Sequence, residues 1–337
     1  MHLPHRLRCV VLAILTTGVT LSASAADPIK LRVGWVNTPS QLPPIMLAKE
    51  GVARHAGRSY TLEPIRFTGT PAMLKSFAAG GLDIAPLTFF TFAQAILAAG
   101  ITDLRIIADG FQDGVEGYQT NTFLVHRDSP VKSVSDLKGT VVASNGFGGG
   151  ADIAMRAMLR RHGLEDKRDY TVTFTEFSRM KDLLAQRKVD LIMVINPFGR
   201  DPELRAISRT LFTEKDAIGT TQTAIWTPRA GFLKVNRAAV TDYLEDYLRV
   251  LGWYSDPKNV EEVLRIVTAY TKQPRERFEG WIFAKGDYYR DPKGIPDLKA
   301  LQGNLGLLKE LGFLKSDIDV ASYSDLSLVN AAGSRVP

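Results

Sequence analysis

One helix-and-strand unit of this sequence occurs twice, and the second copy follows the first after 107 residues. In the first copy Thr70-Pro71 starts a helix, because an early proline lacks only a backbone N–H that would have no partner there. Apolar residues then recur three and four positions apart, and Gly80-Gly81 ends the helix before a short strand at residues 82–85. A helix that leads directly into a strand is half of an α/β unit.

The second copy starts at Ser178 and ends in a strand at residues 189–192, so that Asp190 corresponds to Asp83 of the first copy. The strands that precede the two helices are also alike. Each copy needs a sheet of its own, and the repeat therefore predicts an α/β protein with two similar lobes. The alternative is a coincidence between two common α/β patterns.

The order of the other segments distributes the two lobes along the chain. Extended stretches near residues 120–127 and 219–228 are the expected crossings between them. The first lobe is then discontinuous, with residues 27–122 and 224–337, and its C-terminal part is helical. The second lobe is predicted to span residues 123–223.

The N-terminus has the three parts of a secretory signal peptide. Arg6 and Arg8 supply the charge, residues 10–21 are apolar, and Ala23-Ser24-Ala25 is a cleavage signal. We expect residues 1–26 to be removed, by cleavage near Ala25 or Ala26, and a soluble periplasmic protein to remain. The single cysteine, Cys9, lies in this segment, so the mature chain is predicted to have neither disulfides nor thiol chemistry.

Charge and histidine content argue against several classes of function. The formal net charge of +6 is spread over the chain, which is not the pattern of a nucleic-acid-binding protein. After signal-peptide removal the histidines are His55, His126 and His162, and none is spaced from another as metal ligands on one helix are. We expect no metal, no cofactor and no enzyme activity, and we interpret Asp83 and Asp190 as structural.

A glycine-rich loop is the first candidate for ligand binding. Asn145, Gly146, Phe147 and Gly148 follow a predicted strand at residues 140–144 and lead into a helix. Glycines allow backbone N–H groups to approach a ligand, and a helix N-terminus favours an anion. The loop meets only a relaxed form of the dinucleotide pattern, and it could equally be a tight strand-to-helix turn.

Other candidates follow the ends of other predicted strands, which in open α/β sheets surround the ligand. Their hydroxyls, amides and one aromatic ring suit a small polar ligand with an apolar part, although each alone could be an ordinary turn residue. They are Trp35, Asn37, Thr38 and Gln41 after the first strand, Thr68 and Gly69 after the second, Thr88 after the third, and Asn196 in the other lobe.

These segments resemble the NitT/TauT family of periplasmic substrate-binding proteins, which serve ABC importers of nitrate, taurine, alkanesulfonates and related compounds. The resemblance covers roughly residues 29–330 and is carried by four segments: Phe67-Thr68-Gly69, Ala79 to Ala85, Val134 to Ala143 and Gln186 to Asp190. It implies a type II periplasmic-binding-protein fold, with two α/β lobes joined by two crossover strands, that closes around its ligand. It also implies that the loops after the strands contact the ligand.

The resemblance further implies a partnership with a membrane permease and its ATPase, and we expect a monomer. The interpretation is a receptor for a small organic anion, such as a sulfonate or a carboxylate. Because the loop at 145–148 is richer in glycine than the sulfonate pattern, a pyrimidine-type thiamine precursor stays open as the ligand. An exported enzyme on the same fold and a ligand-binding sensor are the alternative functions.

Overall fold

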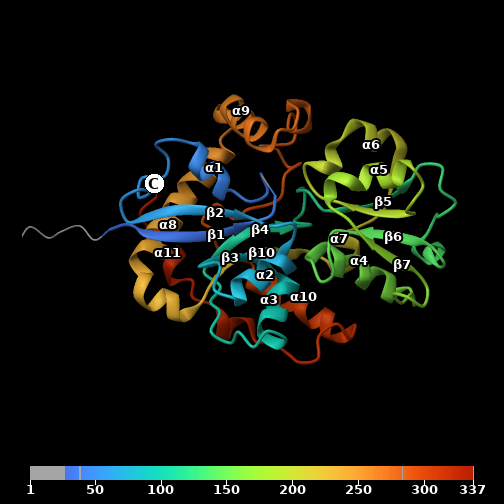
Figure 1. Cartoon of the computed structure of the whole chain (residues 1–337), viewed down its shortest axis with the longest axis horizontal. Helices are drawn as coiled ribbons and strands as arrows, with labels where there is room; N and C mark the ends of the chain where they lie inside the picture. Colours follow the sequence, from blue (N-terminus) through green and yellow to red (C-terminus); the bar gives the residue numbers. More distant parts are fainter. Residues whose placement is uncertain (1–26, 38, 283, 337) are drawn as a thin grey trace, which may run out of the picture.

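The computed structural model describes residues 27–37, 39–282 and 284–336 (Figure 1). The predicted signal peptide and Thr38 lie outside these residues. Figure 1 shows two sheets side by side, each covered by helices on both faces. Each sheet has five strands, so the prediction of an α/β fold with two lobes is confirmed.

The first sheet has the strand order β2-β1-β3-β10-β4. β1 runs parallel to β2 and β3, whereas β10 is antiparallel to β3 and β4. The strands are β1 (Ile29–Trp35), β2 (Tyr60–Arg66), β3 (Ile84–Thr88), β4 (Ala108–Asp113) and β10 (Thr221–Pro228).

The second sheet repeats this arrangement in the order β7-β6-β8-β5-β9. β6 runs parallel to β7 and β8, and β5 is antiparallel to β8 and β9. The strands are β5 (Thr122–His126), β6 (Val141–Ser144), β7 (Thr171–Phe174), β8 (Leu191–Val194) and β9 (Ser208–Thr213). The chain passes from the first sheet to the second between β4 and β5 and returns between β9 and β10, close to the predicted crossings.

The helices cover both faces of each sheet, and α9 lies above α1 at the top of the half that contains the first sheet in Figure 1. Among the described residues no helix is both long and apolar enough to span a membrane. The α-helices are α1 (Pro43–Ala48), α2 (Thr70–Ala78), α3 (Phe89–Leu97), α4 (Gly150–Arg161), α5 (Met180–Ala185), α6 (Pro202–Ile207), α7 (Glu214–Ile218), α8 (Ala230–Ser255), α9 (Val260–Thr271), α10 (Leu298–Glu310) and α11 (Ser327–Gly333). The 3-10 turns are η1 (Val134–Leu137), η2 (Phe177–Arg179), η3 (Phe198–Arg200), η4 (Pro257–Asn259), η5 (Arg275–Arg277) and η6 (Val320–Tyr323).

The repeated unit is also repeated in its hydrogen bonds. Asp83 Oδ2 accepts from the backbone N–H of Arg32 in β1 at 2.9 Å, and Asp190 Oδ2 accepts from that of Val141 at the start of β6 at 3.0 Å. The backbone N–H groups of both aspartates donate back to the carbonyls of the same two residues. Each aspartate therefore fastens the end of its helix–strand unit to the neighbouring strand, which is the structural role expected.

Two boundaries differ from the sequence prediction. Apolar residues at helical spacing predict a helix from Ile45 to His55, but only the short α1 forms, since the chain turns at Gly51, whose φ is +77°. The apolar residues at 104–108 predict a strand there, but β4 starts only at Ala108, because the residues before it form isolated bridges to Arg229 and Ser324 rather than a ladder. Neither feature is visible in local periodicity.

The apolar core consists of two clusters. One lies between the first sheet and α8, and includes Trp226, Tyr243 and Tyr247, all of them at most 1% exposed. The other is continuous through both lobes, because it contains side chains of α2 and α3 as well as side chains of α4 and the second sheet. In this structure the two lobes therefore pack against each other around α3 and α4.

Candidate functional site

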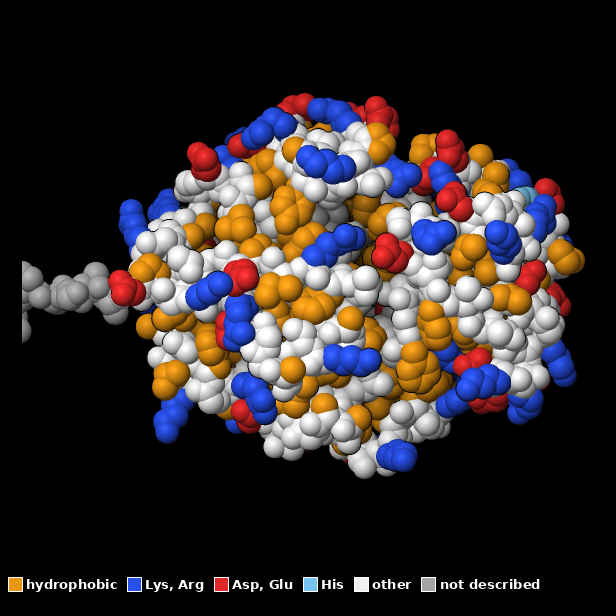
Figure 2. All heavy atoms as spheres, in the orientation of Figure 1, with side chains coloured by type: hydrophobic (Ala, Val, Ile, Leu, Met, Phe, Trp, Pro, Cys, Tyr) orange, Lys and Arg blue, Asp and Glu red, His pale blue; other side chains and the backbone are white. Residues whose placement is uncertain are grey.

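A cleft between the lobes consists of an inner and an outer cavity. The inner cavity has a volume of about 80 Å³, and the outer one about 400 Å³. The two share Val36, Asn37 and Phe177, so they form one continuous space. Figure 2 shows the surface hollowed between the two halves of the molecule.

Loops at the carboxyl ends of strands from both sheets line this space. They are Val36, Asn37, Ser40 and Gln41 after β1, Gly69 and Thr70 after β2, Asn145 after β6, and Ile195 after β8. This is the edge at which open α/β sheets bind ligands. The position of the cleft thus follows from the strand order of the two sheets.

Three helix N-termini converge on the inner cavity. The residues that precede α2, α3 and α4 are Gly69, Thr88 and Gly149, and all three line the cavity. Each helix presents backbone N–H groups without intrahelical partners and a partial positive charge at this end. Among the described residues that line the inner cavity none carries a charged side chain. An anion held here is stabilised by amides and dipoles rather than by a cationic side chain.

Ser40 adds a buried hydroxyl without a protein partner. Its side chain lines the inner cavity, the residue is 4% exposed, and its Oγ has no hydrogen bond to any described residue. The loop that carries it is closed by Gln41, whose Oε1 accepts from the backbone N–H groups of Val36 and Asn37. A buried hydroxyl without a partner costs free energy, which a hydrogen bond to a bound ligand recovers.

The outer cavity is aromatic and is built from both lobes. Trp35 contacts Tyr270 edge to face, with ring centroids 5.7 Å apart, and in the second lobe Phe177 stacks on Phe198 at 6.1 Å. The indole Nε1 of Trp35 is buried without a hydrogen-bond partner among the described residues. The outer cavity therefore suits the apolar part of a ligand whose polar part lies in the inner cavity.

Close approaches between the lobes hold the cleft in this form. The side-chain amide of Asn37 donates to the backbone carbonyl of Asn196 in the other lobe. A Cβ on Gly150 would lie 3.3 Å from Phe89 and Thr88, and one on Gly148 would lie 3.1 Å from Gln94. Part of the glycine content of the loop thus serves the approach of α4 to α3.

The predicted site residues fall into three groups in the structure. Seven of the twelve line the cleft: Trp35, Asn37 and Thr68 line the outer cavity, and Asn37, Gln41, Gly69, Thr88 and Asn145 line the inner one. Gly146, Phe147, Gly148 and Asn196 line neither cavity: Phe147 is 62% exposed and lies under the Arg156 guanidinium, and Asn196 is buried behind the cleft. Thr38 is outside the described residues.

Of the twelve predicted residues, seven therefore line the cleft, four line neither cavity, and one is not described.

Several residues that line the cleft were missed from the sequence. Ser40 and Thr70 lie next to predicted positions, and a search for hydroxyls along the whole loop would have included them. Tyr270 and Tyr288 come from the C-terminal part of the first lobe, more than 180 residues after the loop at 36–41. No local signal in the sequence relates these two tyrosines to the cleft.

A buried hydrogen-bond network extends from the inner cavity to the crossing between the lobes. Tyr288, which lines the cavity, donates through its hydroxyl to Asn121 Oδ1. Asn121 in turn donates from its backbone N–H to Asp113 and from Nδ2 to Glu214, each at 2.8 Å. Burial raises the pKa of Glu214 to about 7, and burial together with the charge of Glu214 raises that of Asp113.

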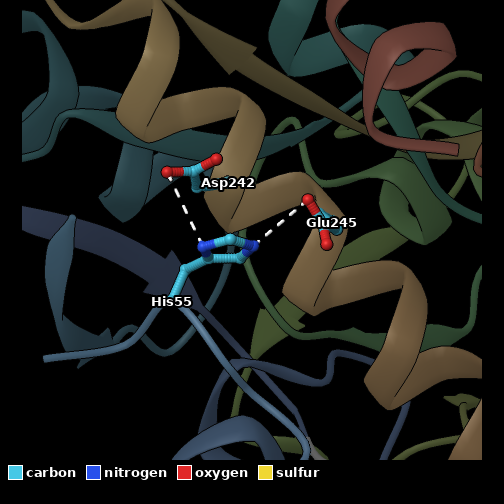
Figure 3. Close-up of side chains that lie close together, drawn as sticks. All are labelled: His55, Asp242 and Glu245. Carbon is cyan, nitrogen blue, oxygen red and sulfur yellow. Dashed lines mark ion pairs between the residues drawn. The ribbon is translucent and has the colours of Figure 1, made fainter. Parts of the chain in front are cut away.

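A second cluster, His55 with Asp242 and Glu245, has the residue types of a metal site but not the arrangement (Figure 3). The imidazole lies between the carboxylates, with Nε2 3.1 Å from Glu245 and Nδ1 3.8 Å from Asp242. The guanidinium of Arg335 contacts both carboxylates. Because a metal ion needs ligand atoms that converge on one point, we interpret these contacts as ion pairs that tie the loop before β2 to α8.

Comparisons with known proteins support a two-lobed binding fold. A family model described as the NMT1-like family matches residues 24–268. The alkanesulfonate-binding protein SsuA from Xanthomonas axonopodis pv. citri, bound to MOPS, is 18% identical, with a TM-score of 0.69 over 90% of this chain and 100% of that one. The periplasmic nitrate-binding protein NrtA from Synechocystis PCC 6803 is 16% identical, with a TM-score of 0.71 over 93% and 91% of the two chains.

One similar structure is that of an enzyme. The desulfurization enzyme DSZB is 12% identical, with a TM-score of 0.63 over 91% of this chain and 99% of that one. At such identities the likeness shows the fold alone. No curated protein matches the chain significantly.

Proposed function

The chain belongs to the NMT1-like family, which confirms the expected NitT/TauT membership, and from this premise we propose that it is the periplasmic solute-binding component of an ABC importer. It binds a small organic anion in the cleft and delivers it to a membrane permease with its ATPase. Alkanesulfonate- and nitrate-binding proteins of the same fold support this proposal. The predicted signal peptide accords with export.

The convergence of three helix N-termini on the inner cavity carries the proposal. Each N-terminus contributes about 0.3–1 kcal/mol toward an anion at an exposed site and more where water is excluded. Ser40, Thr88 and Asn145 add neutral hydrogen-bonding groups around the same space. A sulfonate or carboxylate group accepts several hydrogen bonds at once, so it matches this set of donors.

The aromatic outer cavity favours a ligand with an apolar part. A volume of about 400 Å³ accommodates an aryl or alkyl group beyond the anionic head. Arg66 and Glu176 are the charged side chains among its described lining residues. A nitrate ion would fill the inner cavity alone and leave the aromatic walls without a role.

The similarity to DSZB keeps an enzyme as the second candidate function. An enzyme on this fold needs a nucleophile and a general base within hydrogen-bond reach in the cleft. The described lining residues include no histidine, cysteine or lysine, and Glu176 is the one carboxylate among them. This lining suits binding better than catalysis.

A thermal-shift screen of the purified protein tests the proposal. The compounds are aliphatic and aromatic sulfonates, carboxylates, nitrate and pyrimidine precursors of thiamine. We expect an anion with an apolar part to raise the melting temperature and to be recovered unchanged. Stabilisation by the uncharged pyrimidines alone, or steady conversion of the bound compound, would contradict it.

A further inference from the structure

A third cavity, of about 360 Å³, lies apart from the cleft and shares none of its lining residues. Its floor is the surface of β5 and β9, and its walls are α6, the crossing segment at 118–120 and residues 285–286 of the C-terminal segment. We call it the basic cavity, because four cationic side chains line it: Arg200, Arg205, Arg209 and Lys285. The described lining residues include no aspartate or glutamate.

None of these four cations is in an ion pair within the described part of the chain. Arg200 donates to the side-chain oxygen of Gln119 at 2.6 Å and to the carbonyl of Gly286, and Arg205 donates to the carbonyl of Gly199 at 3.2 Å. Arg209 donates to backbone carbonyls of the neighbouring loop, and Lys285 lies 5.9 Å from the centroid of the Tyr118 ring. Their neutral partners orient these side chains and leave their charges uncompensated.

Two buried arginines elsewhere, Arg156 and Arg290, are paired with carboxylates. Arg156 contacts Asp152 and Asp166, at 2.9 and 2.8 Å, and Arg290 contacts Asp287 at 3.0 Å. In the basic cavity Arg200 and Arg205 repel each other instead, since burial and then the charge of Arg205 lower the pKa of Arg200, while the charge of Asp287 acts in the opposite direction. An anion between these groups would remove the repulsion and supply the missing acceptors.

We propose that the basic cavity is a second anion site, which binds a small multivalent oxyanion with phosphate or polycarboxylate chemistry. The hydroxyls of Thr122, Thr210 and Tyr118 lie beside the four cations as further donors, whereas those of Thr120 and Ser208 donate within the protein, to Asp113 and to the Leu204 carbonyl. Arginine forks and hydroxyls together are the groups that recognise such oxyanions in proteins.

The position of the basic cavity couples it to closure of the cleft. Arg205 and Arg209 belong to the second lobe, whereas Lys285 comes from the segment that returns to the first. Arg200 also contacts Asn196, whose carbonyl accepts from Asn37 of the cleft. An anion held among these residues links the lobes in their closed arrangement, so by linkage it raises affinity for the cleft ligand.

Calorimetric titration of the purified protein with pyrophosphate and with citrate, at fixed ionic strength, tests the second site. We expect saturable binding that becomes at least about tenfold weaker in R205Q/R209Q, because two charge-assisted contacts are lost. The pair R205K/R209K keeps the charges but not the guanidinium forks, so it should lose less affinity than R205Q/R209Q, which separates the effect of charge from that of the substituted positions. The Ser40→Ala variant, altered in the cleft, binds both probes as the parent does.

The control is R58Q/K234Q, which removes the same charge from two exposed positions that line no described cavity. Binding in the control should equal that of the parent. Absence of saturable binding of both probes, equal binding by R205Q/R209Q, or an equal loss in the control would each overturn the proposal.

Discussion

Asp83 and Asp190 have the same role at the same position in the two copies of the repeated unit. Both carboxylates accept a backbone N–H from the neighbouring strand, and both follow a residue in the left-handed conformation that ends the helix. In the first lobe that residue is Gly80, with φ +76°, and in the second it is Arg187, with φ +55°. Spacing alone made this role predictable, because the two aspartates occupy the same place in both copies.

Arg187 offers a test of this equivalence. The left-handed conformation costs a non-glycine residue about 1–2 kcal/mol, whereas glycine lowers stability by about 0.5–1 kcal/mol through unfolded-state entropy. Replacement of Arg187 by glycine should therefore raise the free energy of unfolding by about 0.5 kcal/mol, as measured by urea denaturation. The adjacent Gln186, whose φ is −80°, is the control, and glycine there should destabilise. Destabilisation by both variants would contradict the assignment.

The sequence places Ser40 in the candidate loop after the first strand, but it does not show that the Ser40 hydroxyl lacks a partner within the protein. Its substitution by alanine removes a donor to the ligand but no hydrogen bond within the described protein. We expect S40A to weaken binding about 10- to 100-fold without lowering the melting temperature of the ligand-free protein.

Ser144 is the matched control for Ser40. Its Oγ is also buried without a partner among the described residues, but the residue lines neither cavity of the cleft. S144A should leave affinity unchanged in the same titration. Equal effects of the two substitutions would remove Ser40 from the site.

At the scale of elements, the strands and the longer helices were predictable from periodicity and capping, and their packing was not. The helix expected after the first strand shortened at Gly51, whose left-handed backbone is not apparent from composition. The glycine-rich loop was predicted to contact a ligand through its backbone N–H groups. Gly149 and Gly150 do line the inner cavity, but the close contacts of Gly148 and Gly150 are with α3 of the other lobe.

The contact between α3 and α4 leads to a prediction about closure of the two lobes around the cleft. A leucine at Gly150 would meet Phe89 and Thr88, since even a Cβ there lies 3.3 Å from them. We expect Gly150→Leu to hold the lobes apart, to enlarge the radius of gyration in small-angle scattering and to weaken ligand binding at least about tenfold. A leucine at Gly146, where no atom lies within 4 Å, should change neither quantity. If Gly150→Leu left both the radius of gyration and the ligand affinity unchanged, this contact would not control closure.

At the scale of the whole molecule, the two lobes followed from the repeat, whereas the path of the C-terminal segment did not. Residues 270–288 return to the cleft and supply Tyr270 and Tyr288 to its wall. Long-range packing of this kind depends on shape complementarity between distant segments. A single sequence records helix periodicity in this region but not the partners of each helix.

Buried carboxylates near the crossing make stability depend on pH. Burial raises the pKa of Glu214 to about 7 and that of Asp109 to about 7 as well. In the window between their ordinary values and about 7 the folded state binds more protons than the unfolded state. Stability should therefore fall as pH rises from about 4 to about 7, by an amount of the order of 3 kcal/mol for each strongly shifted group.

Substitution of Glu214 by glutamine checks this assignment. E214Q should flatten the dependence of the free energy of unfolding on pH over the same range, as followed by urea denaturation at several pH values. The exposed Glu203→Gln is the control and should keep the parent's slope. A slope of the opposite sign in the parent would show that Glu214 and Asp109 are ionised without cost.

Calorimetric titration of the protein with a graded series of sulfonates and carboxylates tests the central claim most directly. The series runs from methyl to aryl substituents on the same anionic head. The account predicts one molecule bound in the cleft per chain for these monovalent anions, with affinity that rises as the apolar part fills the outer cavity, and recovery of the compound intact. Affinity that does not change with the apolar part, or no binding across the series, would contradict it.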